Sequence, residues 1–215
     1  MIKQWGVGSF ARLLVRTGTR LEDNWIMRQV RCVAGPQATA IPSFTTKNEL
    51  KALYRLASSS PPGARALEVG SYLGASTCFL AAGLAAVNGH LYCVDTWNNE
   101  TMPGGVRDTF EEFARNIAAV RHLITPVRKR SQDLVPDDLA LPLHLVFIDG
   151  DHSYEAVRAD FALVGPWVTQ QGIVSFHDFG RRKHAGVTKV VADALQGMEW
   201  AMGGRVGSLI WLIRR

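Results

Sequence analysis

The chain has 215 residues, 47% of them hydrophobic and 20% charged, which is enough for one domain with a single large core. Its formal net charge is +5, and its two short basic runs contain no aromatic residues, which argues against a nucleic-acid partner. No run approaches the roughly 18 apolar residues of a membrane span. Three cysteines without a C-x-x-C pair favour the cytoplasm.

The first 60 residues predict a mostly helical extension ahead of the main domain. Residues 5–16 have the pattern of a basic amphipathic helix, for which packing on the domain or on a second subunit is favoured over lying on a membrane. Thr46 and Glu49 have capping-box spacing before a helical stripe. We therefore divide the chain into an extension, 1–60, that caps the site or mediates dimerisation, and a main domain, 61–215.

After the extension, short apolar runs alternate with amphipathic stretches. The apolar runs predict strands at 66–69, 91–94, 123–127, 143–148 and 173–176. The stretches between them predict helices near 75–86, 107–120, 154–164 and 187–195. This alternation is typical of an α/β fold with a parallel sheet and helices on both faces. A predicted hairpin, 200–206 and 209–213, adds an antiparallel last strand.

Polar residues follow the fourth predicted strand directly. Ligands of open α/β sheets bind at the carboxyl ends of the strands, so chemistry is expected here. Asp149 is a hard oxygen donor, and His152 is a natural proton acceptor near neutral pH. Asp151 or Ser153 is expected to cap the helix that begins at Tyr154.

The turn after the first strand has the spacing Glu68-x-Gly70-x-x-x-Gly74-x-Ser76. Glycines let the backbone pass close beneath a ligand. Tyr72 stands where the dinucleotide fingerprint needs a glycine, which disfavours an NAD-dependent oxidoreductase.

The second strand ends at Asp95, Thr96 and Trp97. Asp95 is placed to accept hydrogen bonds from ribose hydroxyls, and Trp97 to cover an adenine. A turn or N-cap role for Asp95 is the alternative. Together the two turns indicate an adenosine-containing ligand without phosphates.

These turns, with segments 147–154 and 172–178, resemble class I S-adenosylmethionine-dependent methyltransferases. They are most similar to small bacterial O-methyltransferases related to macrocin-type sugar methyltransferases and cephalosporin-tailoring enzymes. The resemblance covers about residues 64–215 and implies a Rossmann-like, seven-stranded sheet in a cofactor-binding catalytic domain, 61–215. The candidate S-adenosylmethionine-binding residues are Glu68, Gly70, Ser71, Tyr72, Gly74, Ser76, Asp95, Thr96, Trp97, Ser131 and Asp149.

The same resemblance assigns the reacting groups. The metal ligands of metal-dependent relatives carry over by position to Asp149, His177 and Asp178, with Mg²⁺ expected and Mn²⁺ the alternative. His177 departs from the acid or amide usual in relatives, so orienting the substrate or exchanging protons is its alternative role. The spacing from Asp149 to His152 corresponds to the general base beside the metal, which makes both residues catalytic candidates. His184 is expected to be a surface or cap residue.

We therefore expect a cytoplasmic O-methyltransferase that acts on a hydroxyl of a sugar, an oligosaccharide or a glycosylated natural product. A tailoring hydroxylase, or a non-catalytic binding protein on the same scaffold, is the alternative. Asp149, His152 and Asp178 argue against a pure binder, which needs no base beside a metal site. Residues 98–107 are equally well explained as a lid or as a connector.

Overall fold

The computed structural model describes residues 20–100 and 105–215. Two regions of interest therefore lie outside the described residues: the candidate amphipathic helix 5–16 and positions 101–104 of the loop after the second strand. Within the described ranges, no helix is both long and apolar enough to cross a bilayer.

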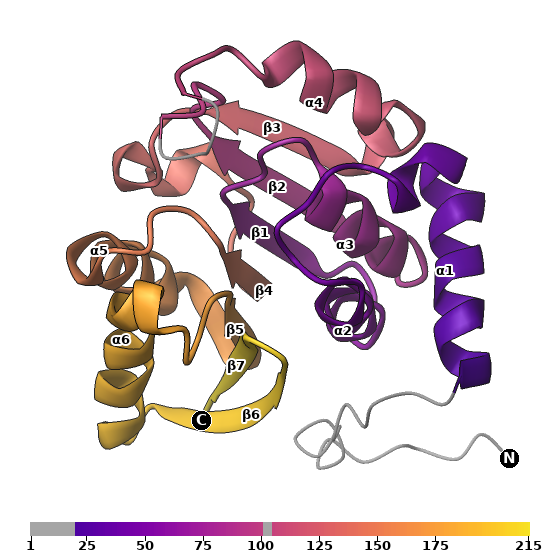
Figure 1. Cartoon of the computed structure of the whole chain (residues 1–215). Helices are drawn as coiled ribbons and strands as arrows, with labels where there is room; N and C mark the ends of the chain where they lie inside the picture. The colour runs from indigo at the N-terminus through magenta and orange to yellow at the C-terminus, as the bar shows by residue number, and fades with distance from the viewer. Residues whose placement is uncertain (1–19, 101–104) are drawn as a thin grey trace, which may run out of the picture.

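A seven-stranded sheet forms the centre of the molecule, in the order β3-β2-β1-β4-β5-β7-β6 (Figure 1). The strands are β1 (Arg65–Val69), β2 (His90–Asp95), β3 (Ile124–Arg128), β4 (Leu143–Ile148), β5 (Val168–Phe176), β6 (Trp200–Val206) and β7 (Leu209–Arg214). Strands β1 to β5 pair in parallel, and β7 runs antiparallel to both β5 and β6. The predicted α/β fold with an antiparallel last strand is confirmed.

Helices cover both faces of this sheet. The α-helices are α1 (Arg20–Ala34), α2 (Lys47–Ser58), α3 (Ala75–Ala85), α4 (Phe110–Asn116), α5 (Tyr154–Val164) and α6 (Ala185–Gln196). Short 3-10 segments are η2 (Pro36–Thr39), η3 (Ala118–Leu123), η4 (Ser131–Asp133), η5 (Pro136–Asp138), η6 (Gly165–Trp167) and η7 (Arg182–His184). Figure 1 shows α1, α2 and α3 on one side of the sheet and α5 and α6 on the other.

Two hydrophobic cores follow from this arrangement. Leu53, Phe79 and Phe113 are buried between the sheet and helices α1 to α4. Val157 and Val191, from α5 and α6, are buried against the opposite face. Because strands buried on both faces need apolar side chains on both, their runs in the sequence are almost continuously hydrophobic.

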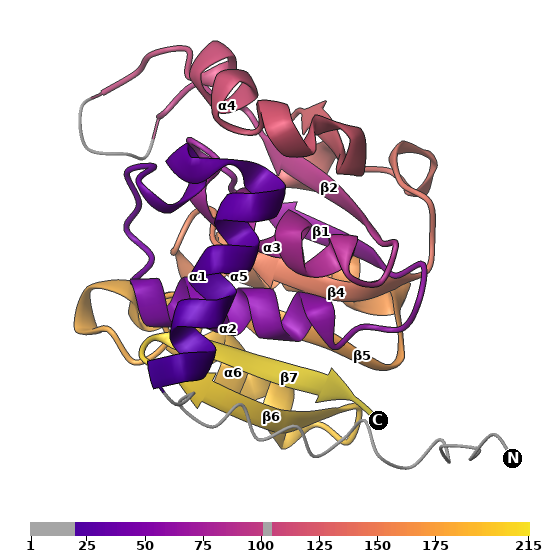
Figure 2. The same cartoon turned by 90° about the vertical axis from the view of Figure 1, so that its right-hand side faces the viewer.

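The described part of the extension packs into the first core. Figure 2 shows α1 lying across α2 and α3. Asp23 of α1 accepts hydrogen bonds from Lys51 (2.5 Å) and Arg55 (2.9 Å) of α2. The predicted capping box is confirmed, with Thr46 as N-cap and Glu49 as its partner. The division at residue 60 stays a prediction.

Two elements differ from the prediction by more than a residue or two at their ends. Strand β5 begins at Val168 rather than near residue 173, because its first half carries the polar residues 169–171, which hide a strand from a hydrophobicity pattern. The predicted helix 107–120 is a shorter α-helix, α4, followed by the 3-10 segment η3.

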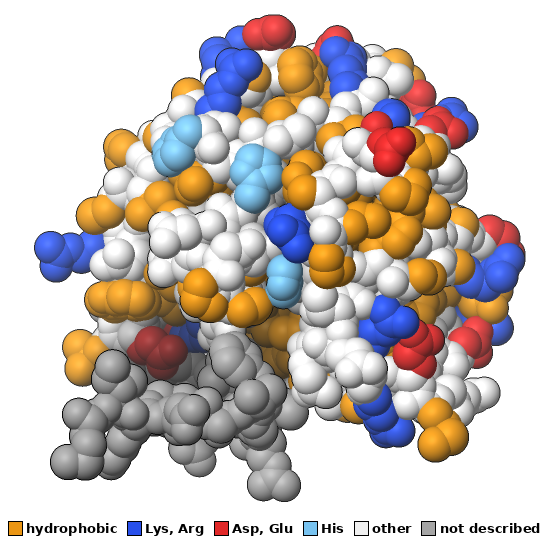
Figure 3. Space-filling model, turned by 180° about the vertical axis from the view of Figure 1, so that it is seen from behind, with side chains coloured by type: hydrophobic (Ala, Val, Ile, Leu, Met, Phe, Trp, Pro, Cys, Tyr) orange, Lys and Arg blue, Asp and Glu red, His pale blue; other side chains and the backbone are white. Residues whose placement is uncertain are grey.

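Charged side chains are dispersed over the surface seen in Figure 3. On this face basic and acidic groups are interspersed with apolar and uncharged ones rather than gathered by sign. A mixed surface of this kind favours solubility and does not create a strong single-sign field on that face.

Candidate functional site

A cleft of about 830 Å³ opens at the carboxyl ends of the parallel strands. Most of the residues singled out from the sequence line it, from both the glycine turn and the acid–histidine segments. The expected residues among its lining are Gly70, Ser71, Tyr72, Ser76, Asp95, Thr96, Ser131, Asp149, His152, His177 and Asp178. Glu68, Gly74 and Trp97 are not part of this lining.

Gly70 brings the turn after β1 against the end of β4. Its φ of +87° lies in the left-handed region, and a Cβ there would stand 2.3 Å from the carbonyl oxygen of Asp149. The neighbouring amide of Asp149 donates to the carbonyl of Val69 at 2.8 Å. Only glycine permits this contact, so the turn of the first strand touches the residue that begins the acidic segment.

We expect Gly70→Ala to lower the free energy of unfolding by more than 2 kcal/mol, given roughly 1–2 kcal/mol for the left-handed backbone plus the overlap with Asp149. Gly63→Ala is the matched control, because Gly63 also has a positive φ (+72°) but nothing within 4 Å of its added Cβ. Urea denaturation measures both. Equal losses in the two variants would contradict the role of the close contact.

Asp95 shapes the cofactor turn with its carboxylate. Its Oδ2 accepts the backbone N–H groups of Ser71 and Tyr72, both at 2.8 Å. Its Oδ1 accepts the backbone N–H of Trp97 at 2.7 Å. The turn role considered from the sequence is therefore present. A carboxylate has about four lone-pair sites, so capacity for further donors remains.

Glu68 and Trp97 support the turn from within the core. Glu68 is fully buried and accepts hydrogen bonds from Ser71 Oγ (2.8 Å) and Thr77 Oγ1 (2.5 Å). Trp97 is 1% exposed, packs on Phe113, and donates from Nε1 to the backbone. The expected adenine contact of Trp97 is not available to a ring in this position, because aromatic packing encloses it.

Ser131 lines the cleft, and its hydroxyl is already engaged in a hydrogen bond. It donates to Asp160 Oδ1 at 2.6 Å, and Gln132 Nε2 donates to the same oxygen at 3.0 Å. Burial raises the pKa of Asp160 to about 6. This acid, on α5, was not singled out from the sequence because it lies on the buried stripe of an otherwise ordinary helix.

The acids that end β4 and β5 converge, as their positions on neighbouring strands predict. Asp149 Oδ1 lies 3.2 Å from His177 Nδ1, and His177 Nδ1 lies 3.6 Å from Asp178 Oδ1. Asp178 has a φ of +60°, an uncommon backbone for a residue with a side chain. Such strain is often found at functional sites, and here it accompanies a carboxylate that faces three histidines.

His177 is sandwiched between carboxylates. Only 3% of its side chain is exposed, and its Nε2 lies 3.4 Å from Glu49 Oε2 on the side away from Asp149. Burial opposes protonation, but Asp149 and Glu49 outweigh it and raise the pKa of His177 to about 10. Glu49 belongs to α2, so the extension contacts a residue that lines the cleft.

His152 lies at the cleft side of the same cluster. Its Nε2 is 3.1 Å from Asp178 Oδ2 and 3.5 Å from Asp149 Oδ1. Burial lowers its pKa, yet the two carboxylates prevail and raise the pKa of His152 to about 9. Among the described residues, two overlapping groups have the donors to hold a metal ion: Asp149, His177 and Asp178; and His152, Asp178 and His184.

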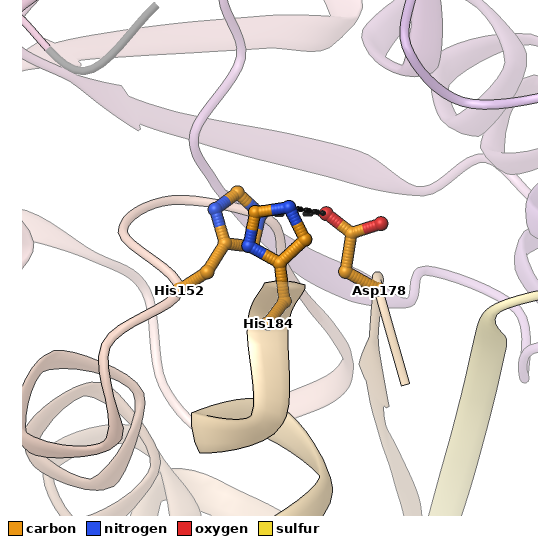
Figure 4. Close-up of side chains that lie close together, drawn as sticks. All are labelled: His152, Asp178 and His184. Atoms are coloured by element: carbon orange, nitrogen blue, oxygen red, sulfur yellow. Dashed lines mark ion pairs between the residues drawn. The ribbon is translucent and has the colours of Figure 1, made fainter. Parts of the chain in front are cut away.

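Glu49 and His184, which contact the cluster of acids and histidines, were also missed from the sequence. Glu49 was recognised only as half of a capping box, and His184 only as a surface or cap residue. His184 does precede α6 as its N-cap, but its Nε2 also lies 3.6 Å from Asp178 Oδ2 (Figure 4). Nothing in its local sequence marks this contact, since it depends on how α6 packs against the turn after β4.

A family profile described as a methyltransferase domain matches residues 67–179, more than half of the chain. The chain belongs to this family. A curated relative, the uncharacterized protein y4gI of Sinorhizobium fredii, is 32% identical over 126 residues, or 56% of this chain. The chain spans only 14% of the length of that relative.

Solved structures, two of them O-methyltransferases, share the fold of this domain. The O-methyltransferase TomG of Streptomyces achromogenes, in complex with SAM, is 18% identical with a TM-score of 0.59, covering 95% of this chain and 93% of TomG. A Bacillus cereus O-methyltransferase in complex with SAH is 15% identical with a TM-score of 0.60, covering 95% and 94%. Cofactor-bound Rv0187 from MTB is 17% identical with a TM-score of 0.62, covering 95% and 92%.

The family match confirms that the chain contains the predicted methyltransferase domain. The macrocin-type subgroup and the roles of individual residues stay predictions.

Proposed function

We propose that this methyltransferase domain uses S-adenosylmethionine and a divalent cation to methylate a hydroxyl of a sugar or a glycosylated product. One observation carries the proposal: a single cleft joins the glycine turn and Asp95 to the cluster of Asp149, His152 and Asp178. A cofactor held at the first set of residues would present its methyl group beside the second. The SAM and SAH complexes of proteins with this fold support the choice of cofactor.

The cofactor end of the cleft suits an adenosine without phosphates. Gly70 and Ser71 offer backbone at the floor, and Asp95 offers carboxylate oxygens of the kind that bind ribose hydroxyls in this class of sheet. The cleft lining also includes the polar side chains of Ser131 and Asp160, and the pKa of Asp160 is raised by burial. We assign this end to the adenosine and the glycine turn to the methionine part.

Methyl transfer from a sulfonium is an in-line displacement, and the acceptor oxygen must lose its proton as it attacks. Positioning that oxygen about 3 Å from the methyl carbon supplies much of the rate. His152 is the base in this proposal, because it faces the cleft and is held by Asp149 and Asp178. An imidazole that accepts the proton at Nε2 becomes a cation stabilised by the same two carboxylates.

The donors of Asp149, His177 and Asp178 fit a divalent cation. They lie within 4.8 Å of one another, and Glu49 on Nε2 of His177 leaves Nδ1 facing the two acids. A carboxylate behind a histidine in this way is common around metal ligands. A divalent cation there would supply positive charge that lowers the pKa of the acceptor hydroxyl and of His152. Arg181, 2.8 Å from Asp178 Oδ1, is the competing cation.

We infer the sugar acceptor from the family resemblance, because the spacing of Asp149 and His152 is similar to that in sugar-methylating relatives. The chemistry of the cleft wall supports it. Asn99, Glu100 and Lys183 line the same cleft and offer the mixed donors and acceptors that a polyhydroxylated molecule needs.

Calorimetric titration with S-adenosylhomocysteine, with and without Mg²⁺ or Mn²⁺, tests the proposal on wild type and Asp149→Ala. We expect micromolar binding of S-adenosylhomocysteine by the wild type and loss of the metal heat in the variant. Asp137→Ala, which removes an exposed acid outside the cleft, is the control for charge. Absence of S-adenosylhomocysteine binding by the wild type would contradict the proposed cofactor.

A further inference from the structure

We propose that His152, Asp178 and His184 form a binding site for a transition-metal ion of the Zn²⁺ type. The three side chains come from separate segments: the turn after β4, the end of β5, and the residue before α6. Figure 4 shows the two imidazole rings side by side with Asp178 facing them. This set differs from the oxygen-rich one of the proposed catalytic cation, although the two share Asp178.

The spacing of the donor atoms matches three ligands around one ion. Asp178 Oδ2 lies 3.1 Å from His152 Nε2 and 3.6 Å from His184 Nε2. One donor atom from each of the three residues lies within 4.8 Å of the others. Ligands about 2.1 Å from a tetrahedral Zn²⁺ ion lie roughly 3.4 Å apart, so small side-chain rotations would complete the site.

The backbone brings the histidines together independently of any ion. A Cβ at Gly186 would stand 2.7 Å from the carbonyl oxygen of His152, so only glycine lets the start of α6 approach the turn after β4 this closely. The ring centroids of His152 and His184 are 4.3 Å apart as a result. Two basic rings at this distance around one carboxylate are arranged for a shared cation.

The other contacts of these side chains leave Asp178 Oδ2 and His152 Nε2 available to bind an ion. Arg181 binds Asp178 through Oδ1, at 2.8 Å, while both histidines face Oδ2. Nε2 of His152 is itself buried and makes no hydrogen bond of good geometry among the described residues. A buried nitrogen without an aligned donor or acceptor is a position where an ion can bind without displacing an existing hydrogen bond.

The donor set defines the class of ion. Two imidazoles and one carboxylate favour Zn²⁺, Co²⁺ or Ni²⁺ over Mg²⁺ and Ca²⁺, which prefer oxygen ligands. Three protein ligands leave a position open toward the cleft, as in many accessible zinc sites. Arg181 and Lys183, which line the cleft with these ligands, add positive charge that lowers the affinity for a cation.

Binding at this site has a consequence for the reaction. The ion would occupy Nε2 of His152, the atom that takes the proton in the proposed function, and Zn²⁺ is therefore expected to inhibit methyl transfer. This consequence rests on the proposed function, whereas the binding site itself does not.

Competition with a chromogenic chelator measures Zn²⁺ affinity for wild type, His184→Ala and His122→Ala. We expect His184→Ala to weaken Zn²⁺ binding by more than about 100-fold. Removing a residue that only hydrogen-bonds to a metal ligand already lowers metal affinity by about 10–100-fold, and His184 is itself a proposed ligand. His122 is an exposed histidine outside the cleft, and its variant should match wild type. Equal Zn²⁺ affinity of wild type and His184→Ala would overturn the site.

X-ray absorption of the Co²⁺ or Zn²⁺ protein counts imidazole ligands directly. We expect two in wild type and one in His184→Ala, and a single imidazole in wild type would instead place the ion at Asp149, His177 and Asp178. Titration with S-adenosylhomocysteine runs in parallel. If the wild type does not bind S-adenosylhomocysteine, the proposed methyltransferase function is contradicted, whatever the imidazole count. The imidazole count tests only the metal site.

Discussion

Replacing His152 by alanine is expected to lower kcat by about 10²–10⁴-fold, the usual contribution of a positioned general base. The affinity for S-adenosylhomocysteine should stay within about twofold of wild type, because the side-chain contacts of His152 are with Asp149, Asp178 and His184 rather than with the glycine turn or Asp95. Its imidazole faces Asp149 and Asp178, which would stabilise the positive charge that it acquires. Steady-state kinetics and calorimetry measure the two quantities.

The pH dependence separates a base from a structural role. A base must be unprotonated, so the wild-type rate should rise with pH toward the pKa of His152, which the two carboxylates raise against the effect of burial. A cation bound beside it would move that rise to lower pH. His152→Ala should lack the rise, and His122→Ala should keep it. A variant that retains both the rate and the rise would show that another group takes the proton.

The order of the elements was predictable because the central strands, such as β1 and β4, are buried on both faces. Continuous apolar runs such as Leu143–Ile148 leave few other interpretations, and the strand bounds there agree with the prediction. The convergence of Asp149 and Asp178 was predictable for a related reason. Adjacent parallel strands end at one edge, so residues that follow them directly must meet.

Contacts between residues far apart in the chain have no comparable pattern in the sequence. Glu49 sits 128 positions from His177 and 159 from Ser208, and its capping box accounted for it completely at the level of the sequence. For Trp97 the local sequence indicated too much rather than too little: its position after Asp95 suggested a ligand contact, whereas the ring is buried. The aromatic residues of α4 that enclose it come later in the chain.

Glu49→Ala is expected to lower the free energy of unfolding by about 3–5 kcal/mol, the cost of removing one partner from a buried ion pair. Glu49 is 1% exposed, and Oε1 accepts two hydrogen bonds from Ser208, through its backbone N–H (2.6 Å) and its hydroxyl (2.8 Å). Oε2 accepts the backbone N–H and the hydroxyl of Thr46 and faces His177. Alanine leaves these buried donors and the histidine without their acceptor.

Two comparisons make the Glu49 result specific. Glu155→Ala, at an exposed first-turn position of α5, should change stability by no more than about 0.5 kcal/mol. Glu49→Gln keeps the shape but removes the charge, so it should fall between wild type and alanine and weaken Mn²⁺ binding by about 10–100-fold. Denaturation in guanidinium with a chelator gives the stabilities. A loss below about 1 kcal/mol in Glu49→Ala would mean that His177 finds its counter-charge in Asp149 alone, and that α2 only covers the site.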